Sequence, residues 1–439
     1  MRILVIAAAF GLAGLAAPAS AQVADAGLFD GKPGPRLRHF ASENDFYRYA
    51  NRFRRPAPRR QGIMAESDDD SANIVVTGSR AQNEPASDNP EITNNQTRGV
   101  DEGGIVKQIG HHLIVLQDGR LFSVDLGTGP SPKMRLAGRI DVYRDEENAA
   151  DWYDEMLVFG NRILVTAYSY EDDASEITVV RMAPDGSMKR EGRWLISSGD
   201  YYSTENYATR LVGDNLVMYT PHQLSGYGPF KMPRLRRARG DGRADRGQET
   251  LSAVDIYAPP GEIDYPVLHT VSVCPITRGI ECRTVGIVGS NMREFFVSPD
   301  DVFLWAGTPE EIPWGIDYGN IQRTSCPTGK RWSDPEQETA LLYRVPIDRG
   351  KVGAVALEGV PANQFSFDSR EGRFRALLGE RKGGCLGPDE AWPLALLDIP
   401  LTAFSETIRH IAPRAYTPLP PIEGEELENR FMGDWLVYG

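Results

Sequence analysis

The histidines, serines and cysteines are the side chains that could do acid–base, metal or nucleophilic chemistry, so their spacing is considered first. Six histidines are scattered without the H-x-H or H-E-x-x-H spacing that binds zinc: His39, His111, His112, His222, His269 and His410. The nucleophile elbow G-x-S-x-G is also absent. The motifs therefore predict no catalytic residue, no metal ligand and no cofactor site, and they leave open a triad of residues distant in sequence.

Charged clusters are the next candidates. The runs Glu171-Asp172-Asp173 and Asp300-Asp301 lack the D-x-[DN]-x-[DN]-G calcium loop, so solvated turn carboxylates are favoured over a calcium site. Six arginines between Lys231 and Arg246 predict a mobile basic loop, with anionic lipid or polysaccharide as the alternative ligand. They are Arg234, Arg236, Arg237, Arg239, Arg243 and Arg246. The overall formal charge of −13 disfavours nucleic acid as a partner.

Four cysteines allow three disulfide pairings: Cys274, Cys282, Cys326 and Cys385. We favour Cys274 with Cys282 and Cys326 with Cys385, because the first pair brackets a short turn-like stretch. No C-x-x-C occurs, which argues against a thiol redox site or a zinc knuckle.

The N-terminus has the three parts of a secretory signal. Arg2 precedes an apolar run from Ile3 to Ala17, and Ala19-Ser20-Ala21 is a small-residue cleavage site. The run is shorter than the ~20 residues of a membrane-spanning helix, and no cysteine follows it for lipid attachment. We therefore predict a signal peptide over residues 1–21 that is cleaved after Ala21. The remaining chain would be secreted or periplasmic, with no transmembrane span.

Two segments precede the main domain. Residues 22–55 include a predicted amphipathic helix from Ser42 to Arg55, with Ser42 and Asp45 resembling a capping box. Its apolar stripe would cover the main domain or, alternatively, an anionic membrane face. Residues 56–98 are rich in Pro, Ser, Asp, Asn and Gln and are predicted to be a disordered linker.

Residues 99–439 consist of short apolar runs separated by Gly, Asp, Asn and Pro, which is typical of strands and turns. A turn followed by an apolar strand starts six times, at residues 110–115, 160–165, 213–218, 300–304, 372–376 and 433–437. Five answering strands follow, at residues 121–125, 177–180, 251–255, 340–343 and 394–398. Units that each leave an apolar face exposed can bury it by stacking radially. The pattern therefore predicts an all-β fold, a β-propeller of about six to seven blades, with a pair of β-sandwiches as the alternative.

Three segments of the chain stand out as possible family motifs: residues 37–49, residues 93–107 and Asn429 to Asp434. They resemble segments of a bacterial family of secreted proteins with a C-terminal β-propeller distantly related to WD40 repeats. Residues 37–49 are similar to its N-terminal helix, and Asn429 to Asp434 to its late V-R-F-M-G-D turn. Residues 93–107 are similar to its entry motif T-N-x-Q-x-x-G-V-D-E-A-D-I-V-K. The matching residues of this entry motif include Gly99, Val100, Asp101, Glu102, Ile105, Val106 and Lys107. The resemblance implies a fold and a compartment but no reaction.

The chain departs from that family in two ways. Gly103 and Gly104 stand where the family usually has Ala-Asp, and the last turn-plus-strand unit has no answering strand before Gly439. The last blade is therefore predicted to be incomplete, or closed by an N-terminal strand from Ile74 to Thr77 or from Ile105 to Lys107.

The function favoured by these observations is a binding or assembly module for an envelope protein or polysaccharide. A hydrolase or lyase with scattered residues in the propeller channel is the alternative, so enzyme activity stays undecided. Ile74 to Arg80 also resembles the I-V-V-T-G-S-R segment that precedes the plug of TonB-dependent receptors. A TonB-system or outer-membrane partner could pair with it by strand addition.

Overall fold

The fold is almost entirely β. The computed structural model describes residues 4–7, 27–31, 33–56, 95–128, 133–143, 152–199, 209–238, 244–263, 266–277, 280–307, 340–379, 392–422 and 427–439. Within these ranges the single α-helix is α1 (Glu43–Asn51), and the rest consists of strands, turns and short 3₁₀ helices. No helix in the described part of the chain is long and apolar enough to cross a membrane.

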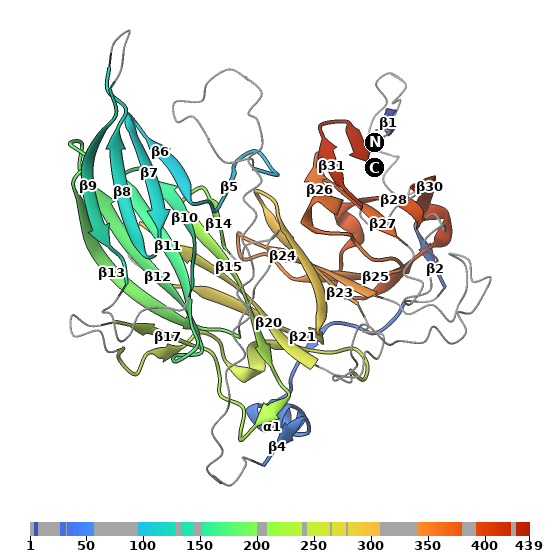
Figure 1. Ribbon diagram of the computed structural model, residues 1–439. Helices are drawn as coiled ribbons and strands as arrows, with labels where there is room; N and C mark the ends of the chain where they lie inside the picture. Colours follow the sequence, from blue (N-terminus) through green and yellow to red (C-terminus); the bar gives the residue numbers. More distant parts are fainter. Residues whose placement is uncertain are drawn as a thin grey trace, which may run out of the picture.

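The strands form sheets that follow one another around the molecule in chain order (Figure 1). Blade 1 contains β6 (Val106–Ile109), β7 (His112–Gln117), β8 (Arg120–Asp125) and β9 (Arg135–Asp141). Blade 2 contains β10 (Trp152–Phe159), β11 (Arg162–Ser169), β12 (Ala174–Met182), β13 (Met188–Ser197), β17 (Arg234–Arg237) and β18 (Gln248–Glu249). In each, the first strand lies on the inner side and the later strands lie farther out (Figure 1).

Segments from elsewhere in the chain extend blades 3 and 4, which have seven and six strands. The core of blade 3 is β14 (Thr209–Val212), β15 (Asn215–Gln223), β20 (Pro266–Pro275) and β21 (Arg283–Ser290). Blade 4 contains β22 (Met292–Val297), β23 (Asp301–Gly307), β24 (Ala340–Pro346), β25 (Gly353–Leu357) and β29 (Arg409–Ile411). Blade 5 contains β26 (Phe367–Arg370), β27 (Arg373–Gly379), β28 (Trp392–Pro400) and β30 (Tyr416–Ile422).

The chain ends in a half-blade, β31 (Asn429–Met432) and β32 (Trp435–Tyr438). An N-terminal strand, β1 (Leu4–Ala7), pairs antiparallel with its outer edge. The last blade is thus extended by an N-terminal strand. The strand is not Ile105 to Lys107, because Val106 begins β6 of blade 1. Ile74 to Thr77 lies outside the described residues, as do Cys326, Cys385 and residues 8–21.

Two-residue turns explain the recurring glycine. Gly110, Gly160, Gly213 and Gly433 each have φ between +56° and +60° and open a turn between two paired strands. That left-handed backbone suits the right-handed twist of the flanking strands and is adopted by glycine at no steric cost. These four predicted turn-plus-strand units are present as hairpins.

Two predicted elements are wrong. Residues 251–255, predicted as an answering strand, form the 3₁₀ helix η2 (Ala253–Asp255), and Leu251 packs with the apolar side chains around α1. The answering strand of blade 3 is β20, which is buried along nearly its whole length. The basic segment is not entirely loop, because Arg234 to Arg237 form β17. There Leu235 is buried and Arg236 donates to the Asp172 carboxylate at 3.0 Å.

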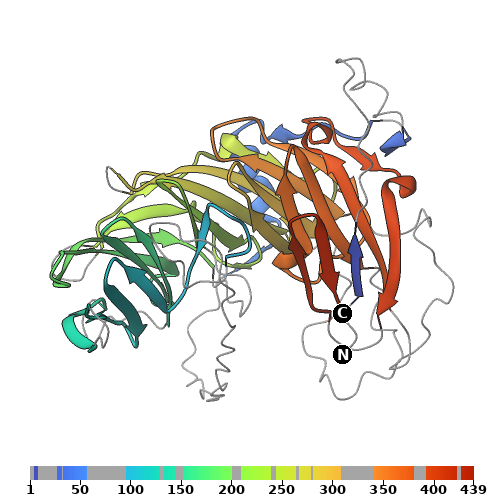
Figure 2. The same cartoon turned by 90° about the horizontal axis from the view of Figure 1, so that it is seen from above.

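The N-terminal segment, residues 27–56, runs along the outer side of blades 3 and 4 (Figure 2). Its short strand β2 (Phe29–Asp30) pairs with β29, and β3 (Arg38–His39) pairs with β19 (Ile256–Ala258), itself a strand added to blade 3. Helix α1 is capped by Ser42, whose Oγ accepts from the N–H of Asp45 at 3.1 Å. It ends before the predicted Arg55, because β4 (Arg54–Arg55) pairs with β16 (Gly226–Tyr227).

The apolar stripe of α1 covers the main domain. Phe46 and Ala50 are fully buried and pack with Leu224, Phe230 and Leu268. Of the two surfaces considered for this stripe, the structure shows the sheet edge of blade 3 and not an exposed membrane-facing side.

Candidate functional site

The residues of the entry motif hold the inner strands together. The strand β5 (Val100–Glu102) pairs antiparallel with β14, the inner strand of blade 3. Gly104 then exchanges backbone hydrogen bonds with Met156 of β10 in blade 2, and Val106 begins β6 in blade 1. Gly99 permits the turn that leads into β5, because its φ of +83° is unfavourable for other residues. One stretch of about ten residues thus joins three blades at their inner edges.

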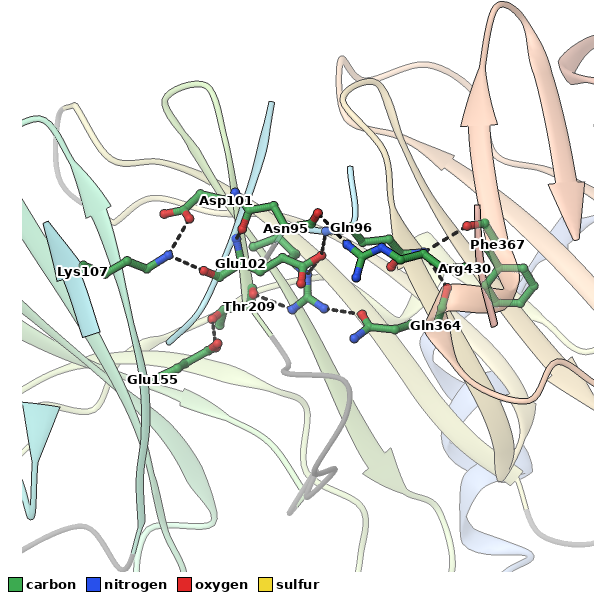
Figure 3. Close-up of polar contacts among 11 residues, drawn as sticks. Asn95, Gln96, Asp101, Glu102, Lys107, Glu155, Thr209, Gln364, Phe367 and Arg430 are labelled. Atoms are coloured by element: carbon green, nitrogen blue, oxygen red, sulfur yellow. Dashed lines mark hydrogen bonds and ion pairs between the residues drawn. The ribbon is translucent and has the colours of Figure 1, made fainter. Parts of the chain in front are cut away.

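Polar side chains and backbone oxygens around this stretch form one network, which we call the inner-edge network (Figure 3). It consists of Asn95, Gln96, Asp101, Glu102, Lys107, Glu155, Thr209, Arg210, Gln364, Phe367 and Arg430. Its members come from blades 1, 2, 3 and 5 and from the half-blade.

Lys107 is the buried cation of the network. Its side chain is 6% exposed, and Nζ donates to Asp101 Oδ1 at 2.6 Å and to the backbone oxygen of Glu102 at 2.6 Å. A buried ammonium is costly to desolvate unless such partners surround it. Lys107 therefore fixes the turn between β5 and β6 in one conformation.

Arg210 is the second buried cation. Its guanidinium donates to Gln364 Oε1 at 2.7 Å and to the backbone oxygen of Thr209 at 2.8 Å, and Nε lies 3.9 Å from Glu102 Oε1. Because Gln364 precedes β26, this side chain links blade 3 to blade 5 across the inner side of the molecule.

The residues just before β5 extend the network to the last blades. The Gln96 side-chain amide donates to the backbone oxygens of Gln364 at 2.7 Å and Phe367 at 3.0 Å. Arg430 of β31 donates to the backbone oxygen of Asn95 at 3.0 Å. The half-blade is therefore tied to the same stretch of chain as blades 1 to 3.

Gly103 and Glu155 occupy adjoining space. A Cβ added at Gly103 would overlap the Glu155 carboxylate and would lie 2.6 Å from Glu155 Cβ. Glu155 is 1% exposed and accepts a hydrogen bond from Thr209 Oγ. The absence of a side chain at Gly103, one of the two departures from the family motif, thus makes room for a carboxylate from blade 2.

The carboxylates of the network contact its other members. Asp101 accepts from Lys107, Glu102 accepts from the backbone N–H of Gln96, and Glu155 accepts from the Thr209 hydroxyl of blade 3. Among the predicted entry-motif residues, Val100 is buried in the apolar core and Ile105 is 45% exposed, so neither belongs to the polar network.

The histidines are not brought together as metal ligands in the described residues, which contain no group of three or more candidate ligands. The spacing of the histidines gave no sign of one buried pair. His222 on β15 and His269 on β20 are both buried in blade 3, where His269 bonds to the Tyr219 hydroxyl at 2.7 Å and to the Ser290 backbone oxygen at 2.9 Å. Burial lowers the pKa of each imidazole to about 3, so both are neutral at physiological pH.

The acidic runs that were considered for calcium take part in ion pairs. Asp172 binds Arg236, and Asp301 binds Arg344 Nε at 2.8 Å. Burial raises the pKa of Asp301 above its ordinary value although Arg344 opposes this. The structure also places a disulfide between Cys274 and Cys282, the first of the two favoured pairs.

A comparison with protein families agrees with this architecture. The model of the family described as beta propeller domain matches residues 92–383, which is more than half of the chain. The chain belongs to the beta propeller domain family. The match begins at residue 92, just before the inner-edge network. It therefore includes the segment that joins the inner strands of blades 1 to 3. No curated protein matches the chain.

Proposed function

We propose that this propeller is exported by a cleaved signal peptide, residues 1–21, and acts in the periplasm or outside the cell as a binding or assembly module for an envelope protein. Polysaccharide is the other ligand class suggested by the sequence. Two observations support export: the disulfide between Cys274 and Cys282, which suits an oxidising compartment, and the three-part N-terminus.

The observation that carries the binding role is an apolar sheet face on blade 1. One face of this blade packs on blade 2 through Ile114, Leu116 and Leu121. The other face carries two cross-strand apolar rows, Val106–Val115–Phe122 and Leu113–Val124–Leu136. All six side chains are half-buried or exposed, and Leu136 is 58% exposed.

A contiguous apolar face of this kind favours a protein ligand over a polysaccharide. Protein interfaces have an apolar centre and a polar rim, and here Arg120, Arg139 and Asp141 border the rows. The alternative enzyme would need reactive groups in the channel. The inner-edge carboxylates instead bond to Lys107, Gln96 and Thr209, which supports a structural role for them.

A photo-crosslinking residue at Phe122 tests the proposal in the exported protein. We expect one discrete envelope protein to be captured at Phe122 and its yield to fall when Val115→Asp adds a charge to the same row. The matched control is the crosslinker at Lys189, an exposed residue of β13 in blade 2. Capture of the same proteins from both positions would contradict a specific site.

Two further measurements address the other parts of the proposal. The mass of the exported protein should correspond to a chain that starts at Gln22. A partner at Ile74 to Arg80, outside the described residues, is tested by deleting residues 56–98 and repeating the capture. Turnover that depended on Asp101, Glu102 or Glu155 would favour the hydrolase or lyase alternative.

A further inference from the structure

Blade 2 includes strands from the basic segment of the sequence. This segment contains β17, which pairs with β13 and carries Arg234, Arg236 and Arg237. The whole chain has a formal charge of −13, so a positive face on it is a local feature. Such a face raises the local concentration of anionic ligands.

Arg237 shares one face of the sheet with a tryptophan. Trp194 of β13 lies opposite Arg237 on β17 and opposite Ile177 on β12, and directly opposed residues of antiparallel strands point to the same face. Ile177 packs in the apolar core between blades 2 and 3, so this face is turned toward blade 3. Arg237 is exposed, and its guanidinium carbon lies 5.7 Å from the centre of the indole ring.

Two more arginines lie on the other side of β13. Arg162 of β11 lies opposite Arg181 of β12. Both share the face of Leu164, which lies two residues after Arg162 and packs with Ile177. Glu191, the extra residue of a bulge in β13, accepts from Arg162 Nε at 2.7 Å and also from Arg181. Two guanidinium groups thus share one carboxylate, and one positive charge of this pair is left over.

Gly192 lets the Trp194 ring lie across the sheet. A Cβ added at Gly192 would be 2.5 Å from Cη2 and 2.8 Å from Cζ3 of Trp194. The six-membered ring therefore occupies the space above Gly192, and the indole is half-buried. It lies between Arg237 on β17 and the arginines on β11 and β12. We call the five side chains around this ring the blade 2 face: Arg162, Arg181, Glu191, Trp194 and Arg237.

We propose that the blade 2 face binds an acidic polysaccharide. One side of a sugar ring presents C–H groups, which can pack on an indole as other apolar groups do. Carboxylates on the neighbouring sugars can accept hydrogen bonds from the arginines on both sides of the ring. An anionic membrane fits less well, because surfaces that enter a membrane project apolar side chains into it, whereas Trp194 lies along the sheet.

Binding of the full chain to immobilised polygalacturonate, a polymer of uronic acid, tests the proposal by biolayer interferometry. We expect saturable binding that weakens as the salt concentration rises. The double variant Arg181→Gln, Arg237→Gln should bind about tenfold more weakly or worse, because it removes two charge-assisted hydrogen bonds. Trp194→Leu, which keeps an apolar side chain, should bind about two- to tenfold more weakly.

The matched control is the double variant Arg135→Gln, Arg139→Gln. It removes two exposed arginines from β9 of blade 1 and should bind polygalacturonate as the wild type does. The single variants Arg181→Gln and Arg237→Gln lie on opposite sides of the indole, and each should weaken binding. Melting temperatures equal to that of the wild type would show that the losses do not come from unfolding.

Three results would overturn the proposal: no binding of the wild type to polygalacturonate, an equal loss in the two double variants, or equally tight binding of poly-L-glutamate. Tighter binding to phosphatidylglycerol vesicles would instead identify a lipid surface as the ligand. The blade 2 face is separate from the apolar face of blade 1, so capture of a protein at Phe122 and binding of polygalacturonate can fail independently.

Discussion

Gly103 allows the packing of the inner-edge network to be tested with a single methyl group. In Gly103→Ala, the new Cβ would overlap the Glu155 carboxylate, and the Glu155 residue is only 1% exposed. The carboxylate must shift and weaken its hydrogen bond from Thr209. Overpacking costs about 1–3 kcal/mol, and loss of a hydrogen bond to a charged group about 1.5–3 kcal/mol. We expect the free energy of unfolding to fall by about 2.5–6 kcal/mol, the sum of the two.

The assay is urea denaturation of four proteins: wild type, Gly103→Ala, Glu155→Ala and the double variant. Because Glu155→Ala removes the group that the methyl would strike, the two changes should not add, and the double variant should be more stable than the sum predicts by about 1–3 kcal/mol. A Gly103→Ala variant of wild-type stability, or strict additivity, would refute the contact described above. Gly261→Ala is the matched control, because a Cβ added at Gly261 would have no neighbouring atom within 4 Å.

Three other predictions concern parts of the same fold. Acid should destabilise the folded protein through His222 and His269. Their pKa of about 3 in the folded state lies below the unfolded value of ~6.5. Between these pH values the unfolded chain binds more protons than the folded protein, so the stability falls as the pH drops. From about pH 7 to about pH 4.5 the loss should be about 2–3 kcal/mol per histidine, and a much shallower pH dependence in the His222→Asn, His269→Asn variant than in wild type would identify the source. Lys107→Met should lower the free energy of unfolding by about 2–3 kcal/mol, because it leaves Asp101 without its cation. The control Arg48→Met, which breaks an exposed pair with Asp45, should change that free energy by less than about 0.5 kcal/mol. Equal effects of the two variants in chemical denaturation would contradict the difference in burial. Replacing Cys274 and Cys282 by serine should lower the free energy of unfolding by about 2–3 kcal/mol, because the unfolded chain gains the entropy of an open loop with a sequence separation of 8. A melting temperature of the wild-type protein that does not change when reductant is added would contradict this prediction.

The sequence predicts the fold better than the site, and the reason is physical. Hairpins such as the one at Gly160 are local, because a glycine turn and two alternating strands lie within a few residues of each other. Leu251 to Asp255 is equally apolar but folds as a 3₁₀ turn, because the longer strand β20 takes its place beside β15. Whether a short apolar run becomes a strand depends on which other segments compete for the same place in the sheet. A sequence pattern does not contain that information.

The inner-edge network depends on contacts between residues far apart in the chain. Gln96 meets Gln364 and Phe367, and Arg430 meets Asn95. No spacing rule links such positions, so the entry motif could be found only through its family resemblance, and its structural role only from coordinates. The buried pair His222 and His269 was missed for the same reason: the two residues lie on neighbouring strands separated by a long connection.

The belt formed by residues 27–56 has a consequence for the order of folding. Asp30 meets His410, and Arg36 meets Glu406, at sequence separations of 380 and 370 residues. The start of the belt therefore leaves the ribosome early, while these two partners are among the last residues to be made. It can dock on blade 4 only after β29 has been made, and loop closure over such lengths is slow. Until then the outer rim of blade 4 remains open, whereas α1 and β3, which contact residues between Leu224 and Leu268, can dock on blade 3 earlier. A chaperone that holds the first residues of the belt could delay the final step without unfolding any blade.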